Sequence, residues 1–392
     1  MRTIGNLLDQ SKGLGRGFDF LRVALSIGVV TWHTTPIATG SWAEGETRFL
    51  WIFDYSILEM FFGLSGFLIA GSALRLTLSN FLINRSLRIV PALAVEIVLS
   101  ALIIGPFFTS LPLSAYYSDI GTYQYFTNIV GLINYILPGV FSDNPLHQVN
   151  ASLWTIPFEI GCYVIMALFI SFNVLKKPLL ILIFATAILL AGLVVTAYGY
   201  RGHPEGVAQN VMDYLIFGRG SRLLVFFMLG IFSFLFRYRI PYSRTWFYFS
   251  IFYLFTLDAA IHKHYPFPVI SLISAIPTLY IMLYIGVSKL PPMPLFRHGD
   301  YSYGIYLYGW PIMQAVRATL PIAQHPLLLW AFSMPLIILV SMLSWHFVEK
   351  PILRQRKKFS FVARQRLEEI VQDTGSTLAT AERANSIAPP GL

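Results

Sequence analysis

Six ionisable side chains within long apolar stretches of this sequence are candidates for chemistry: Arg22, His33, Glu59, Glu96, Glu159 and Asp258. A charge at the centre of a bilayer costs at least about 2.5–3.5 kcal/mol on insertion scales, so each group needs a partner or a function. Arg22 and His33 are separated by ten residues, so on one helix they share nearly the same face about 16 Å apart. Such a helix offers a cation for an anionic group at one depth and an imidazole for proton transfer at another.

Glu159 is the third candidate for chemistry. Counted at about 1.5 Å per residue, it lies about 12 Å below the far membrane surface, at a depth where it can meet His33. A carboxylate bonded to one ring nitrogen would fix the tautomer of the imidazole and stabilise its protonated form. The alternatives are structural: Arg22 can reach the membrane interface, neighbouring threonines can satisfy His33, and Glu159 can serve in pairing alone. For Glu59, Glu96 and Asp258 no further sequence feature indicates chemistry, so these three carboxylates are interpreted as structural.

The composition is that of a membrane protein. The chain has 392 residues, of which 56% are hydrophobic and 12% charged, whereas soluble domains carry about 25% charged residues. So few charges cannot cover a water-facing surface. The net charge of +9 would suit nucleic acid, but we expect no such partner, because the cations fall where membrane topology needs them. Cys162 is the only cysteine, which excludes an intrachain disulfide.

The expected fold is all-α, a polytopic transmembrane bundle of about ten helices with both termini cytosolic. Runs of about 20 apolar residues predict the spans, at approximately 18–38, 49–74, 86–108, 151–173, 178–199, 219–236, 245–261, 267–287, 302–318 and 327–347. With the N-terminus inside, 21 of the 28 Lys and Arg residues fall on cytosolic segments, six fall outside, and Arg22 lies within the first span. This asymmetry sets the orientation.

The expected domains are a cytosolic segment 1–17, a transmembrane domain 18–349 and a basic cytosolic tail 350–392 that is partly disordered. The longest interruption is an extracytoplasmic loop at about 109–150, with an apolar piece at 125–140 that lies in the interface or re-enters the membrane. Two apparent motifs are set aside. Ser65 lacks the strand-to-helix elbow of a hydrolase nucleophile, and His262-Lys263-His264 is a short loop rather than a metal site.

Six ordered segments resemble the acyltransferase-3 family of bacterial integral-membrane O-acyltransferases. FDFLRVALSIGVVTWH (18–33) is similar to the family's Arg-x10-His opening and EMFFGLSGFLIAG (59–71) to its second span. NRSLRIVP (84–91) resembles its Arg-x-x-Arg-Ile-x-Pro motif and SLWTIPFEIGCY (152–163) its Ser-Leu-Trp-x5-Glu. SYGIYLYGWP (302–311) and FVEKP (347–351) resemble its last two spans. The resemblance extends over about residues 17–356.

The resemblance implies transfer of an acyl group from acyl-coenzyme A to a hydroxyl of a cell-surface glycan. It assigns His33 as the catalytic base, Arg22 as its companion at the catalytic and donor sites, Glu159 as the functional glutamate, and Arg85 and Arg88 as donor-site residues. One departure is Gly309, which stands where the family often has histidine. No appended extracytoplasmic domain is apparent, so the chemistry is expected within the membrane domain.

The expected reaction uses acetyl-CoA, or another acyl-CoA, as co-substrate and no metal. Its partners are a polysaccharide or lipid-linked oligosaccharide and the lipid bilayer of the bacterial inner membrane. A neutral histidine is suited to take the proton of the attacking hydroxyl. The sequence leaves open whether His33 acts as a base or is itself acylated. It also leaves open the acceptor sugar, the acyl chain and the oligomeric state. The competing class is a proton-coupled transporter, which would also bury charges among its helices.

Overall fold

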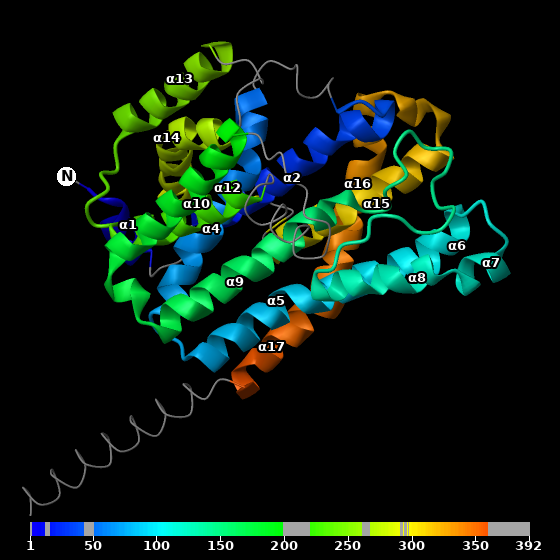
Figure 1. Cartoon of the computed structure of the whole chain (residues 1–392), viewed down its shortest axis with the longest axis horizontal. Coiled ribbons are helices and arrows are strands. Elements are labelled where there is room, and N and C mark those ends of the chain that lie inside the picture. The colour runs from blue at the N-terminus through cyan, green and yellow to red at the C-terminus, as the bar shows by residue number, and fades with distance from the viewer. Residues whose placement is uncertain are drawn as a thin grey trace, which may run out of the picture.

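The chain is built from helices in a computed structural model that describes residues 2–11, 16–42, 51–198, 220–260, 267–290, 293, 296 and 298–359 (Figure 1). Over these ranges there is no β-strand beyond two isolated bridges, Thr3 with Pro241 and Thr109 with Val140. The predicted all-α fold is therefore confirmed.

Each of the ten expected spans coincides with a helix. The ten helices are α2 (Arg16–Thr39), α4 (Trp51–Ala73), α5 (Leu78–Leu99), α9 (Ile156–Ser171), α10 (Pro178–Tyr198), α12 (Ser221–Leu235), α13 (Arg244–Ala260), α14 (Phe267–Val287), α15 (Ser302–Thr319) and α16 (Pro326–Ser344). Five segments in the described ranges are long and apolar enough to cross a bilayer: Tyr55–Ala73, Leu78–Phe108, Ala151–Ser171, Val269–Val287 and Pro326–Gln355. The count of ten spans and the cytosolic termini stay predictions.

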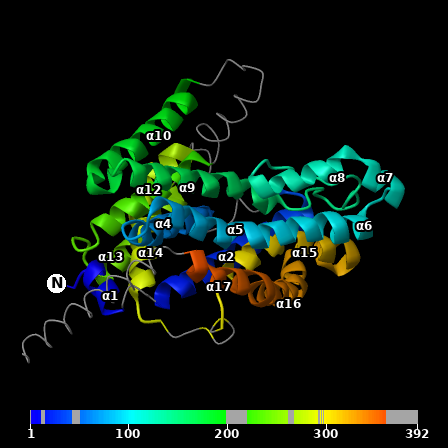
Figure 2. The same cartoon turned by 90° about the horizontal axis from the view of Figure 1, so that it is seen from below.

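Two of the long segments contain a π-helical turn. Helix α5 continues through the π turn Ser100–Ile104 into α6 (Gly105–Phe108), and α16 continues through the π turn Trp345–Glu349 into α17 (Lys350–Phe359). A π turn inserts one residue and rotates the following side chains around the axis, and it is frequent near functional sites. α17 packs along α5, and α9 also runs beside α5 (Figure 2).

Helix α2 joins two parts of the core. Phe18, Leu21 and Leu25 pack into the larger cluster with α4 and α14, whereas Val30 and Ile37 pack into a smaller cluster with α15 and α16. Its two ends thus meet different helices, and Arg22 and His33 have different surroundings.

The segment 109–150 is ordered by its own polar side chains. It contains α7 (Leu113–Ser118), α8 (Ile120–Gln124) and the 3-10 helix Tyr125–Val130. Buried Asn128 donates to the carbonyls of Tyr125 and Asn134, and its own side-chain oxygen accepts from the Asn134 N–H. These bonds satisfy backbone groups that a non-helical segment would otherwise leave unpaired.

The N-terminal segment forms α1 (Ile4–Gln10), which docks on the turn before α13. The N–H groups of Ile4 and Gly5 donate to the carbonyls of Ile240 and Arg237. The loop with His262, Lys263 and His264, and the tail from residue 360, lie outside the described residues.

The α4–α12 contact depends on glycines that let the two backbones approach. A Cβ atom at Gly66 would stand 2.0 Å from the carbonyl oxygen of Phe227, and one at Gly230 would stand 2.0 Å from that of Gly63. Small residues at such crossings are typical of helix pairs in membranes.

We expect Gly66→Ala to lower the free energy of unfolding by about 1–3 kcal/mol, because the added methyl group has to push a backbone carbonyl away. Thermal unfolding of the purified protein in lipid nanodiscs measures this change. Gly161→Ala is the matched control, since a Cβ there would meet only Leu224 at 3.9 Å. Equal melting temperatures for the two variants would contradict the close α4–α12 contact.

Candidate active site

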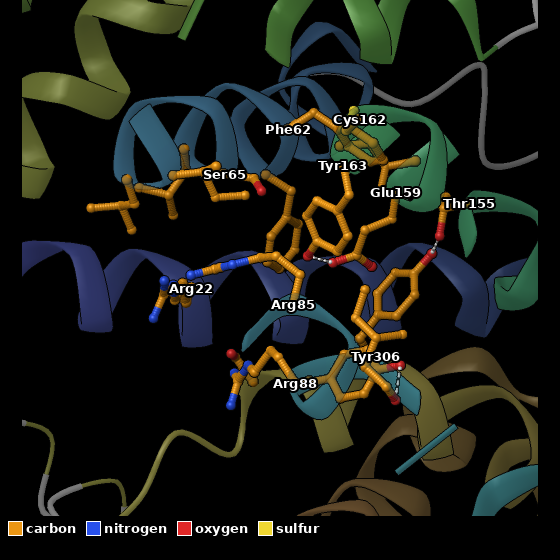
Figure 3. A pocket seen from close by; sticks show the side chains of 18 residues that line it. Arg22, Phe62, Ser65, Arg85, Arg88, Thr155, Glu159, Cys162, Tyr163 and Tyr306 are labelled. Carbon is orange, nitrogen blue, oxygen red and sulfur yellow. Dashed lines mark hydrogen bonds between the residues drawn. The ribbon is translucent and has the colours of Figure 1, made fainter. Parts of the chain in front are cut away.

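A cavity of about 150 Å³ lies between α2, α4, α5, α9 and α15 (Figure 3). The space is about ten times the 10–15 Å³ that one water molecule requires. Leu58, Phe61, Phe62, Leu68 and Ile69 form an apolar wall on α4. The polar side chains around it are Arg22, Ser65, Arg85, Arg88, Thr155, Glu159, Tyr163, Ser302, Tyr303 and Tyr306. Four of the five site residues predicted from sequence therefore converge on one cavity.

Asp300 joins two of the cationic side chains. Its carboxylate accepts from Arg88 at 2.7 Å and from Arg22 at 3.1 Å, and the Ser302 hydroxyl donates to its other oxygen at 2.5 Å. Burial alone would raise the pKa of the Asp300 carboxyl, but the Arg88 and Arg22 guanidiniums, aided by Ser302, outweigh it and lower the pKa. Glu349 lies 3.6 Å from Arg88 on the other side. This chain of charges is called the Asp300 cluster below.

Arg85 is the cavity cation without a carboxylate partner in the described part of the chain. It lies one turn before Arg88 on α5, its guanidinium stands 6.0 Å from the centre of the Phe81 ring, and its Nε atom is buried without a hydrogen bond. Figure 3 shows the three guanidiniums gathered at one side of the cavity and Glu159 at the other. A buried cation of this kind attracts an anionic ligand.

Glu159 is bonded to Tyr163 rather than to His33. The Tyr163 hydroxyl, four residues along α9, donates to the Glu159 carboxylate at 2.7 Å. The expected meeting of Glu159 with His33 was wrong, because equal depth in the membrane does not place two side chains on facing sides of their helices. Glu159 instead faces the cavity that holds Arg85 and Arg88.

Tyr306 lines the cavity and is held by the start of α9. Its hydroxyl bonds with the Thr155 hydroxyl at 2.6 Å and donates to the Ser152 carbonyl at 2.9 Å. Ser152 and Thr155 belong to the 3-10 helix Ala151–Thr155 that precedes α9. The Ser-Leu-Trp motif thus fixes the junction of α9 and α15.

His33 does not line the cavity. Its ring lies edge-on to Trp310, with centroids 4.9 Å apart, and edge-on to Trp42 at 6.4 Å. Trp310 is four residues beyond Tyr306, so it lies one turn farther along the same face of α15. His33 is 8% exposed and makes no hydrogen bond within the described ranges. His33 therefore lies outside the cavity lining, without the carboxylate partner that the sequence predicted.

Gly309 occupies a position where a larger side chain has no room. A Cβ atom there would stand 2.8 Å from a methyl group of Val30, one turn before Thr34 on α2. A histidine at this position would separate α2 from α15. No other histidine of the described residues stands in its place beside His33.

The remaining buried charges have structural partners. Arg222 donates to Glu59 at 2.6 Å and lies over the Tyr55 ring. Glu96 accepts from Ser100 and Asn150. Asp258 accepts from the N–H of Ile52 at the start of α4. The structural interpretation of these three carboxylates is consistent with their contacts.

Asp300 and Glu349 are the site residues that sequence reasoning missed. Asp300 lies in the connection before α15, where a carboxylate is ordinarily solvated, and nothing in its spacing distinguishes it. Glu349 stands within the FVEKP motif, and its 1% exposure marks it as a buried carboxylate near a membrane surface. The FVEKP motif was therefore the sequence feature that could have pointed to Glu349.

Comparison with known proteins identifies the family. The acyltransferase domain of the acyltransferase-3 family matches residues 16–346, and the chain belongs to that family. It is 26% identical over 301 residues to the O-acetyl transferase of Shigella phage Sf6, an alignment that covers 75% of this chain and 83% of the phage protein. No solved structure matches the chain significantly. The predicted family is thereby confirmed, with membrane-type helices that agree with it.

We expect Asp300→Asn to destabilise the protein by about 1–3 kcal/mol, since it leaves two guanidiniums without their shared carboxylate while all three side chains are partly exposed. A lowered native pKa contributes stability that is complete above the ordinary pKa of about 3.9 and is lost as pH falls below it. The difference in melting temperature from the wild type should therefore be constant from pH 8 to 5 and shrink below about pH 4. Asp19→Asn is the control, because Asp19 is 81% exposed and 3.9 Å from Arg22. A difference that grows on acidification would contradict the assignment.

Proposed function

We propose that this protein moves an acetyl group from acetyl-CoA to a hydroxyl of an exported polysaccharide or lipid-linked oligosaccharide in the bacterial inner membrane. Membership of the acyltransferase-3 family supports acyl transfer. The name of the phage relative, an O-acetyl transferase, supports acetyl as the acyl group and oxygen as its acceptor.

The cavity with Arg22, Arg85 and Arg88 is the observation that carries the proposal. Coenzyme A is a polyanion with a long, slender pantetheine arm, and arginine holds phosphates through paired, charge-assisted hydrogen bonds. Arg85 forms no ion pair with a carboxylate in the described ranges and is available to the phosphates, while the apolar wall on α4 suits the arm. The thioester would then lie toward Tyr306, nearest to His33.

His33 would take the proton of the acceptor hydroxyl as its oxygen attacks the thioester carbonyl. The new C–O bond forms, the C–S bond breaks, and the imidazolium returns the proton to the leaving thiolate. Without a carboxylate partner, His33 would have to be oriented by its two tryptophan neighbours. Transfer through an acylated His33 would use the same groups in two steps.

Glu159 would act from the donor side. Its hydrogen bond from Tyr163 fixes the carboxylate at the cavity wall opposite the arginines. There it would offset part of their charge and set the depth at which the thioester stops. We therefore assign Glu159 as a positioning residue rather than as the partner of His33.

Purified protein in nanodiscs, given acetyl-CoA labelled in its acetyl group and a glycan acceptor, should produce labelled ester on the glycan. His33→Ala should lower this rate by at least about 10²-fold, the usual contribution of a general base, whereas His325→Ala, outside this region, should not. Label that accumulates inside sealed vesicles without any covalent product would instead support a transporter.

Arg85→Ala should raise the KM for acetyl-CoA about tenfold or more with a smaller effect on kcat, because the lost charge contacts the donor away from the reacting carbonyl. Initial rates at varied acetyl-CoA measure this. Arg75→Ala is the control, since Arg75 is exposed and bonds only to the Gly71 carbonyl. An unchanged KM for acetyl-CoA in Arg85→Ala would show that the phosphates do not bind in this part of the cavity.

A further inference from the structure

Three aromatic rings meet at the end of α2 farthest from the Asp300 cluster. The rings of Trp42 and Trp310 are nearly parallel, at 20° with centroids 5.9 Å apart, and the His33 ring is edge-on to both. Trp310 is fully buried, whereas Trp42 is 37% exposed. One large aromatic ring beside the proposed base therefore keeps a surface available to a ligand.

The turn at Gly40 brings Trp42 back over His33. Gly40 ends α2 with φ +78°, a left-handed conformation, and its N–H donates to the Pro36 carbonyl at 2.8 Å. A Cβ atom at Gly40 would also stand 2.9 Å from Pro145. This is the usual glycine stop of a helix. It reverses the chain toward the helices, whereas an anchor of the interfacial aromatic belt would continue outward.

Trp310 holds the other side of this group in place. Its indole N–H donates to the Gln148 carbonyl at 2.9 Å, and Gln314 on the next turn donates to the same carbonyl at 2.7 Å. Trp310 is thus a fixed wall, and Trp42 is the exposed one. Trp42 therefore places an exposed indole next to the imidazole of His33.

We propose that Trp42 is a stacking platform for a pyranose ring of the acceptor, which sets one ring hydroxyl at His33. This inference rests on the proposed function and names the substrate class of that site. A pyranose presents a face of C–H groups with partial positive charge, and the indole face is negative, so the two attract each other while the ring excludes water. Tryptophan supplies this area at a small cost in side-chain entropy.

The test compares two acceptors that carry similar hydroxyls with the full-length protein in nanodiscs free of sugar detergents. Methyl glucopyranoside has a ring face, and glycerol has none. Trp42→Ala should raise the KM for the pyranoside about tenfold more than the KM for glycerol. Trp42→Phe should bring the KM for the pyranoside most of the way back to the wild-type value, because a phenyl ring still stacks. Trp246→Ala on α13 is the matched control, since Trp246 is 54% exposed and its ring contacts Phe249 of the same helix.

Equal effects of Trp42→Ala on both acceptors would overturn the inference and leave Trp42 as a support for His33. A fall in melting temperature alone, with both KM values unchanged, would make it an interfacial anchor. Saturation-transfer NMR of the pyranoside gives a readout without turnover. The wild-type protein could bind the pyranoside without transferring an acetyl group to it, and Trp42→Ala could abolish that binding. This result would refute the proposed function but support Trp42 as a stacking platform.

Discussion

The bond from Asp300 to two arginines is the interaction on which the arrangement of this site depends. Arg22 lies near the start of α2, Arg88 lies on α5, and Asp300 precedes α15. One carboxylate therefore joins three segments that are remote in sequence. Two guanidiniums so close to each other in a largely apolar region would repel without it. Glu349 adds the π turn after α16 to the same cluster. Because α2, α5 and α15 also form the cavity walls, the width of its charged end follows from the geometry of these ion pairs.

The charges of the cavity explain which ligand it favours. Asp300 and Glu349 neutralise Arg22 and Arg88 in the free protein, and Arg85 has no carboxylate partner in the described ranges. At an effective dielectric constant of about 20, an anion about 4 Å from one guanidinium gains about 4 kcal/mol, which a neutral ligand cannot. A phosphate at Arg85 therefore need not displace Asp300, and donor binding and the cohesion of the fold are compatible.

The sequence predicted the helices and pointed to Arg22 and Glu159 as site residues for one reason, whereas Arg85 and Arg88 came from the family motif. Apolar spans leave few places for a charge, and all of these turn toward the same interior. It could not predict the partner of Glu159, because depth along an axis does not give the direction around it, and Tyr163 four residues on already satisfies the carboxylate. Residue spacing also could not reveal Asp300, which lies in a connecting segment. It could not reveal the two π turns either, which change the direction of the side chains that follow them.

The position of His33 constrains how donor and acceptor can meet. Tyr306 lines the cavity, and Trp310, one turn farther along α15, contacts His33. Separating α2 from α15 at this level would open the packing of Gly309 against Val30, where an added Cβ atom would stand 2.8 Å from a Val30 methyl group. Closely packed helices shift less readily than one side chain changes rotamer. In the proposed reaction, an acyl group in the cavity would reach His33 by movement of the Trp310 or Tyr306 ring, and the hydrogen bonds of these rings to the Gln148 and Ser152 carbonyls oppose that movement.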